Sequence, residues 1–107
     1  MNPVEYHVLL ALSSGSLHGY AIKNAIVADS GEAVDPLAGT LYRVIARLIT
    51  AGLIKETVPA GPPESHPGLE RRYYVLTPPG RRALTAESER MARAAAMAKQ
   101  RLRGLKA

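Results

Sequence analysis

Two arginines, four residues apart, are the side chains in this sequence best suited to recognise another molecule. Arg43 and Arg47 lie in the segment GTLYRVIARLITAGLI, residues 39–54. An arginine presents a rigid fork of N–H donors that binds two oxygens at once, on a phosphate or on the edge of a guanine base. At helical spacing, the polar or aromatic side chains on or beside the same face are Thr40, Tyr42 and Thr50. This face is either an ordinary solvated surface or a recognition surface.

The opposite face of the same segment is apolar, as a helix packed on a core requires. Its apolar residues recur at intervals of three and four positions, namely Leu41, Val44, Ile45 and Leu48. Gly52 follows at a position where helices often end in a left-handed residue. The pattern predicts a helix over about residues 38–51, with one buried stripe and one polar stripe.

The distribution of charge sets these two arginines apart from the sequence around them. The 107 residues carry a net charge of +5 at pH 7. Residues 1–53 contain three Lys or Arg residues, Lys23, Arg43 and Arg47, and their net charge is −1. The basic excess lies in residues 81–107, where eight Lys or Arg residues accompany two acidic ones. A general attraction to anions therefore does not explain the placement of the two arginines on one helix face.

The order of the other predicted elements supplies a frame for this helix. Apolar residues at helical spacing predict two earlier helices, over residues 3–14 and 18–29. Two β-prone segments, residues 53–58 and 70–77, flank a Pro- and Gly-rich loop and predict a β-hairpin. A Thr-Pro pair then predicts the start of a long helix over about residues 78–103. Three short helices, a hairpin and a long helix form the mainly α arrangement of a winged helix-turn-helix.

In that arrangement the start of the second helix lies against the DNA backbone, where free N–H groups can hold a phosphate. His18 either caps this helix or contacts phosphate, and Tyr20 either packs on the core or contacts the DNA. Lys23, one turn further along, is also an expected DNA contact. At the base of the hairpin, Arg71 and Arg72 are either phosphate contacts of the wing or part of a solvated strand edge.

Four motifs in series resemble the PadR family of transcriptional regulators. They are YHVLLAL at residues 6–12, HGYAI at 18–22, GTLYRVIARLITAGLI at 39–54 and RRYYVLTPPGRRAL at 71–84. They occur in the family's order and spacing over nearly the whole chain. The resemblance implies a homodimeric winged-helix repressor whose third helix enters the major groove of a pseudo-palindromic operator. It also implies that the C-terminal helix dimerises, and that a small-molecule effector relieves repression in some relatives.

The sequence departs from its relatives at the expected wing tip, GPPESHPG, residues 61–68, which contains no Lys or Arg. We therefore expect the wing to contact DNA through Arg71 and Arg72 alone. The absence of Trp also excludes the tryptophan sandwich by which some drug-sensing relatives hold flat ligands.

Small and apolar residues in the last predicted helix follow the alternating three- and four-residue steps of a coiled coil. The expected dimerisation residues are Leu84, Met91, Ala95, Ala98, Leu102 and Leu105. A core this small cannot cover such a stripe, so a second copy of the chain is the expected partner. We expect residues 1–77 to form the DNA-binding domain and residues 78–107 the dimerisation helix. The basic last turns are a solvated helix end, a DNA-flanking contact or an anchor on anionic lipid.

Other classes of function lack the residues they need. The sequence has no Cys, its three His residues are scattered, and no phosphate-binding loop or nucleophile elbow occurs. We therefore expect no metal site, no cofactor and no enzymatic activity. No apolar run approaches the ~20 residues that span a bilayer, so we expect a cytoplasmic protein without a membrane partner. Besides double-stranded DNA, the alternative partner for the arginine face is another protein, bound by a winged helix that does not bind DNA.

Overall fold

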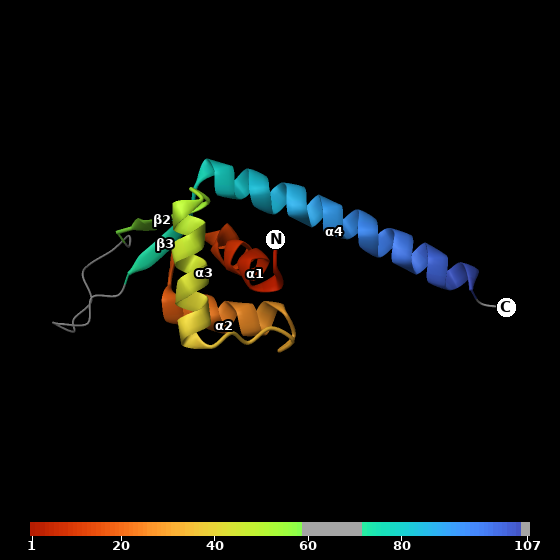
Figure 1. Cartoon of the computed structure of the whole chain (residues 1–107), viewed down its shortest axis with the longest axis horizontal. Coiled ribbons are helices and arrows are strands. Elements are labelled where there is room, and N and C mark those ends of the chain that lie inside the picture. The colour runs from red at the N-terminus through yellow and green to blue at the C-terminus, as the bar shows by residue number, and fades with distance from the viewer. Residues whose placement is uncertain (59–71, 106–107) are drawn as a thin grey trace.

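The structure is a computed structural model that describes residues 1–58 and 72–105. Its elements in chain order are α1 (Pro3–Ala11), the 3-10 helix η1 (Leu12–Ser14), β1 (Leu17–His18), α2 (Gly19–Asp29), α3 (Ala38–Thr50), β2 (Ile54–Thr57), β3 (Tyr73–Leu76) and α4 (Pro78–Gly104). Figure 1 shows the first three helices and the sheet gathered into one body, from which α4 projects. The predicted fold class, a mainly helical winged helix-turn-helix with a small sheet, is confirmed.

The first two helices begin at side-chain caps. Asn2 and Glu5 form a capping box, in which Asn2 Oδ1 accepts from the Glu5 N–H at 2.8 Å and Glu5 Oε1 accepts from the Asn2 N–H at 2.9 Å. His18 Nδ1 accepts from the Ala21 N–H at 3.2 Å and so caps α2. The capping role of His18 is therefore confirmed. Each cap satisfies backbone N–H groups that have no partner within the helix.

The segment between the first two helices differs from the sequence prediction. α1 ends at Ala11 and passes into the 3-10 turn of η1, which ends at Ser14 and is followed by Gly15 with a φ of 145°. β1 then pairs antiparallel with β3, with Leu17 opposite Tyr74. Within residues 1–58 and 72–105 the sheet therefore has three strands, in the order β1-β3-β2, rather than the two of the predicted hairpin. A strand of two residues is too short to show an alternating pattern.

The core lies where the three helices of the body meet the inner face of the sheet. Its most deeply buried members, each at most 4% exposed, are Val8, Leu9, Leu12, Ile22, Ile26, Leu41, Val44, Ile45, Leu48, Ile54 and Tyr74. The four members from α3 are the predicted buried stripe, which is confirmed. Full burial of one such aliphatic side chain contributes about 1.5–3 kcal/mol, so this stripe fixes the rotation of α3 about its axis.

A tight junction sets the direction in which α4 leaves the body. Thr77 Oγ1 caps α4 by accepting from the Gly80 N–H at 3.1 Å, and it donates to the Gly52 carbonyl at 2.6 Å. Gly52 has the predicted left-handed conformation, with a φ of 77°. A Cβ atom on Gly80 would overlap the carbonyl oxygen of Leu53. α4 therefore crosses the end of α3 at a distance that only glycine permits.

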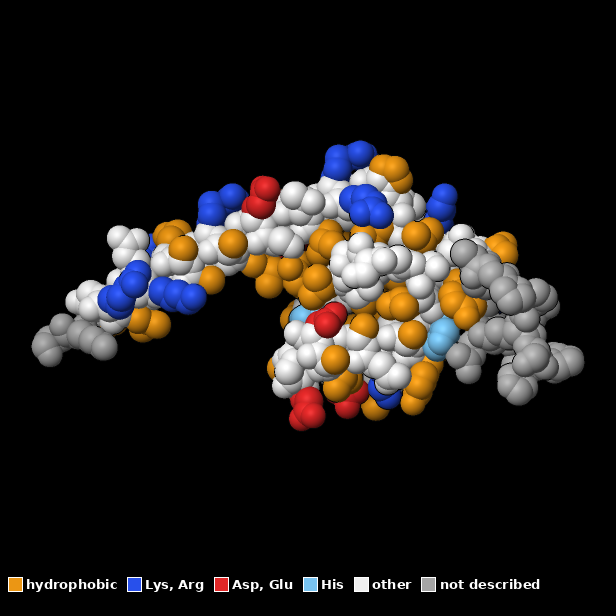
Figure 2. Space-filling model, turned by 180° about the vertical axis from the view of Figure 1, so that it is seen from behind, with side chains coloured by type: hydrophobic (Ala, Val, Ile, Leu, Met, Phe, Trp, Pro, Cys, Tyr) orange, Lys and Arg blue, Asp and Glu red, His pale blue; other side chains and the backbone are white. Residues whose placement is uncertain are grey.

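Beyond this junction α4 has two parts with different surroundings. Ala83 and Leu84 are partly buried against the core, and the Tyr6 hydroxyl lies 2.8 Å from Ser88 Oγ. Residues 89–105 are all exposed. Figure 2 shows hydrophobic side chains gathered on the inner side of α4, next to the body. Across residues 1–58 and 72–105, no helix combines the length and apolar character that crossing a membrane requires.

Candidate nucleic-acid interface

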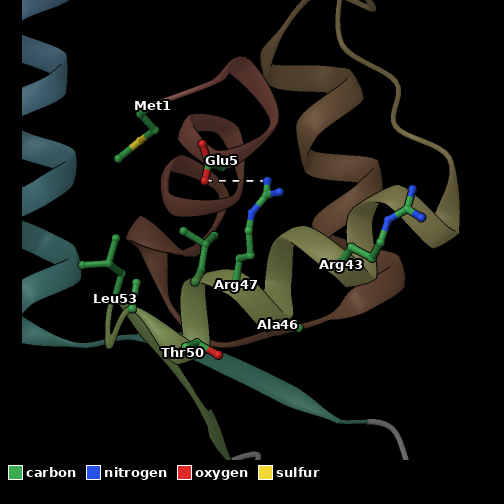
Figure 3. Close-up of a pocket in the computed structure, with 9 residues that line it drawn as sticks. Met1, Glu5, Arg43, Ala46, Arg47, Thr50 and Leu53 are labelled. Atoms are coloured by element: carbon green, nitrogen blue, oxygen red, sulfur yellow. Dashed lines mark ion pairs between the residues drawn. The ribbon is translucent and has the colours of Figure 1, made fainter.

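The polar face of α3 is exposed because the buried stripe occupies the opposite side of the helix. Arg43 lies in the exposed face, with one guanidinium nitrogen 3.4 Å from Thr40 Oγ1. Arg47 lies one turn further along, with a guanidinium nitrogen 3.8 Å from Glu5 Oε2. Figure 3 shows that the two side chains diverge, since Arg47 reaches toward α1 and Arg43 points away from it. The arginines share a helix face, as predicted, but their guanidinium groups do not lie together.

An open pocket of about 870 Å³ lies beside the ion pair of Arg47 and Glu5. Its lining comes from the start of the chain, from α3 and from the turn after α3: Met1, Glu5, Arg43, Ala46, Arg47, Leu48, Thr50, Ala51 and Leu53. Figure 3 shows Ala46 and Thr50 on the side of α3 away from Glu5. The small side chain of Ala46 leaves room beside the arginines for a partner to approach the helix.

Tyr42 connects the exposed face of α3 to the start of α2. A Cβ atom on Gly19 would lie 2.6 Å from the Tyr42 hydroxyl oxygen, so the phenol lies over the first residue of α2. Tyr42 is 52% exposed and Tyr20 is 68% exposed, which means that Tyr20 does not pack on the core. Two phenols therefore lie near the α2 N-terminus, where free backbone N–H groups favour an anion.

His18 joins the start of α2 to the sheet. In addition to capping the helix, its imidazole ring lies edge-on to the ring of Tyr73 in β3, with the centroids 5.5 Å apart. Lys23, the third predicted contact at the start of α2, lines a different pocket with the end of that helix and with Gly31, Glu32 and Asp35. The structure therefore separates Lys23 from the pocket that Arg43 and Arg47 line.

Of the two arginines predicted at the base of the wing, Arg72 lies within the described residues. Arg72 is exposed, and its guanidinium lies 3.5 Å from a carboxylate oxygen of Glu56 on the neighbouring strand. Arg71 and the expected wing tip lie outside the described residues. Tyr74, two residues after Arg72, faces the core. Its burial raises the pKa of the phenol above the ordinary value, Glu56 raises it further, and Arg72 partly offsets both effects.

The predicted dimerisation residues fall into two groups. Leu84 is partly buried against the core of its own chain. The remaining five are exposed, four of them along the projecting part of α4 and the fifth directly after its end: Met91, Ala95, Ala98, Leu102 and Leu105. The heptad spacing does not predict that Leu84 packs against the core of its own chain, because that contact depends on how α4 crosses the body.

Glu5 is the residue of this region that sequence reasoning missed. The capping-box signature, Asn2 followed three residues later by Glu5, could have placed it in the first turn of a helix. Its contact with Arg47 depends on how α1 packs against α3, which neither helix pattern contains.

Comparisons with known proteins identify the family. The sequence profile of the transcriptional regulator PadR-like family matches residues 8–86. Over 92 residues, or 86% of this chain, the sequence is 39% identical to an uncharacterised 37.1 kDa protein in transposon TN4556 of Streptomyces fradiae. The match covers 24% of that curated relative's length.

Solved structures share the fold. A transcriptional regulator from Clostridium thermocellum superposes with a TM-score of 0.70 at 25% identity, covering 97% of this chain and 90% of the other. A PadR family regulator from Clostridium difficile gives 0.76 at 23% identity, covering 94% and 99%. Bacillus subtilis PadR in complex with operator DNA gives 0.68 at 24% identity, covering 80% and 45%. With its winged-helix body, its projecting helix and a profile match over residues 8–86, the chain belongs to the PadR-like family of transcriptional regulators.

Proposed function

We propose that this chain is a cytoplasmic transcriptional repressor that binds a pseudo-palindromic operator in double-stranded DNA as a homodimer. Residues 1–77 are the DNA-binding domain and residues 78–107 the dimerisation helix. The observation that carries the proposal is the two-sided character of α3. Its apolar face is at most 3% exposed, whereas Arg43 and Arg47 lie on the opposite, solvent-facing side. Such a helix presents donors to a groove while the core holds it in place.

On DNA, α3 enters the major groove and the parts around it contact the backbone. Arg43 and Arg47 bind guanine edges or phosphates, and Thr40 and Tyr42 position the helix on phosphate. The second group of backbone contacts comes from the start of α2 and the base of the wing: His18, Tyr20, Lys23, Arg71 and Arg72. The Bacillus subtilis relative, which was solved with operator DNA, supports this reading of the fold.

The exposed half of α4 supports the homodimer. α4 has 27 residues and is therefore about 40 Å long, and its last 16 residues, 89–104, are exposed. Pairing with the same helix of a second copy would cover the stripe that contains Met91 and Leu102. Two α3 helices one helical turn of DNA apart, about 34–36 Å, would then read the two halves of the operator.

The test is selection of DNA from a random duplex library, together with footprinting on the DNA upstream of the protein's own coding sequence. We expect a protected pseudo-palindrome, with affinity that falls log-linearly as salt rises, because each phosphate contact releases counterions. Arg43→Ala should weaken binding to the selected duplex by about 1–3 kcal/mol. A folded protein that protects no DNA would instead favour the protein-interaction alternative.

A small-molecule effector that relieves repression completes the proposal. Its test is a ligand screen on the DNA-bound dimer, with release of the duplex as the signal. An effector must bind the free protein more tightly than the DNA-bound protein. Only such a difference in affinity shifts the equilibrium between the two toward release of the DNA.

A further inference from the structure

Glu5 is held in a fixed place beside the proposed DNA interface. Its Oε1 atom accepts from the Asn2 N–H at 2.9 Å, while its own N–H donates to Asn2 Oδ1 at 2.8 Å. These two hydrogen bonds close the capping box of α1 and anchor Glu5 at both backbone and side chain. The side chain is 23% exposed, so it remains accessible from the pocket that it lines.

The second carboxylate oxygen of Glu5 faces Arg47. Oε2 lies 3.8 Å from a guanidinium nitrogen of Arg47, whose side chain is 60% exposed. Figure 3 shows the Arg47 side chain directed toward Glu5 and α1, away from the direction that Arg43 takes. In the free protein, therefore, one of the two arginines on α3 already has an anionic partner within the same chain.

The strength of this pair decides what it can do on DNA. Exposed ion pairs at such distances are weak, with effects on equilibria of about one- to fivefold. A single solvated phosphate offers Arg47 an interaction of the same kind, so exchanging Glu5 for a phosphate gains little. A bidentate contact to a guanine edge discriminates by about five- to 150-fold, which is enough to draw Arg47 away from Glu5.

We propose that Glu5 is a specificity-determining residue of the DNA interface, a role that rests on the proposed function. It keeps Arg47 away from the phosphates of non-cognate DNA and releases it where the operator offers a bidentate partner. Because the ion pair must break only where Arg47 moves to the operator, Glu5 lowers affinity for the operator more than affinity for non-cognate DNA. A residue outside α3 thus limits both operator affinity and discrimination.

The test is Glu5→Gln, which removes the charge and preserves the cap, because glutamine also serves at this position of a capping box. Binding is measured by fluorescence anisotropy to a duplex recovered by selection and to a scrambled duplex of equal length and composition. We expect operator binding to tighten about two- to fivefold, because Arg47 no longer has to leave an ion pair, and binding to the scrambled duplex to change less.

A double-mutant cycle separates the ion pair from a general effect of charge. Arg47→Ala should weaken operator binding and leave binding to the scrambled duplex nearly unchanged. In the Arg47→Ala background, Glu5→Gln should have no effect on discrimination, because the guanidinium that it restrains is gone. Asp29→Asn is the matched control, since it removes an exposed carboxylate at the far end of α2 and does not alter Glu5 or Arg47.

Three results would overturn the inference while wild-type DNA binding stands: equal tightening on both duplexes, persistence of the effect without Arg47, or the same effect from Asp29→Asn. A folded wild-type protein that binds neither duplex overturns the proposed function itself, and the role of Glu5 on DNA with it. Increased discrimination by Glu5→Gln that disappears without Arg47 supports the inference.

Discussion

The hydroxyl groups of Tyr6 and Ser88, 82 positions apart in the sequence, lie within hydrogen-bonding distance at 2.8 Å. This part-buried contact joins α1 to the point where α4 leaves the body. Beyond it, every described residue of α4 is exposed, so the hydrogen bond marks the outer limit of the contact between helix and body.

Removing one partner of this pair should cost more than removing both. Tyr6→Phe or Ser88→Ala alone should lower the free energy of unfolding by about 0.5–1.5 kcal/mol, because each leaves one hydroxyl without its partner. The double variant should lose less than either single variant, because no hydroxyl is then left without its partner. Urea unfolding at one protein concentration measures all three. Strict additivity would show that the two hydroxyls are not coupled.

Gly80→Ala should destabilise the protein by about 1–3 kcal/mol or more, as overpacking does. The added Cβ would overlap the Leu53 carbonyl oxygen, a backbone atom that cannot turn aside as a side-chain terminus can. Gly39→Ala is the matched control, since a Cβ there meets open space within α3, and it should be neutral or stabilising by up to about 1 kcal/mol. Equal melting temperatures for the two variants would contradict the close crossing.

Tyr74 should make the protein less stable at alkaline pH. Burial holds the pKa of its phenol above the ordinary value of 10.0, so the unfolded chain loses this proton at a lower pH than the folded chain does. The contribution to stability is therefore complete below pH 10 and declines as the pH rises from there through the folded-state pKa. Urea unfolding between pH 8 and 11.5 should show this decline in the wild type.

Tyr74→Phe should reduce the alkaline loss, because phenylalanine has no proton to release. Tyr20→Phe is the control for the loss of a phenol, since Tyr20 is 68% exposed and does not pack on the core. A Tyr74→Phe protein that loses stability above pH 10 as steeply as the wild type would rule out this assignment.

Ala98→Glu should convert a dimer into a folded monomer. Ala98 is exposed in the single chain, so the body tolerates the change, whereas two glutamates facing each other across paired α4 helices repel and lose solvation. We expect the dimer dissociation constant to rise at least about tenfold, measured by sedimentation equilibrium. Gln100→Glu adds the same charge outside the heptad stripe and should leave the dimer intact. A wild type that sediments as a monomer would exclude the paired helix.

The sequence predicts best those features that a single element contains. The buried stripe of α3, the Thr77 cap of α4 and the left-handed Gly52 all follow from local spacing or residue type, and all three are present. β1 escaped prediction because two residues carry no periodicity. Its pairing with β3 depends on residues more than 50 positions away.

The candidate site, too, has features that one helix determines and features that depend on contacts between helices. The position of Arg43 on an exposed face follows from helical geometry alone. The divergence of Arg47 toward Glu5 does not, since it arises from the packing of α1 on α3 and from a capping box in another helix. Contacts between elements are the part of the site that one-dimensional patterns leave out.

The junction at Thr77 and Gly80 has a consequence for how binding sites could change in evolution. Thr77 is bonded to the carbonyl of Gly52 just after α3, and Gly80 lets α4 pass directly over Leu53. In the proposed dimer, this rigid junction between α3 and α4 sets the distance between the two α3 helices. The bases that are read and the spacing between half-sites are then set by separate residues. The bases that are recognised could therefore change in evolution while the half-site spacing is conserved, or the reverse.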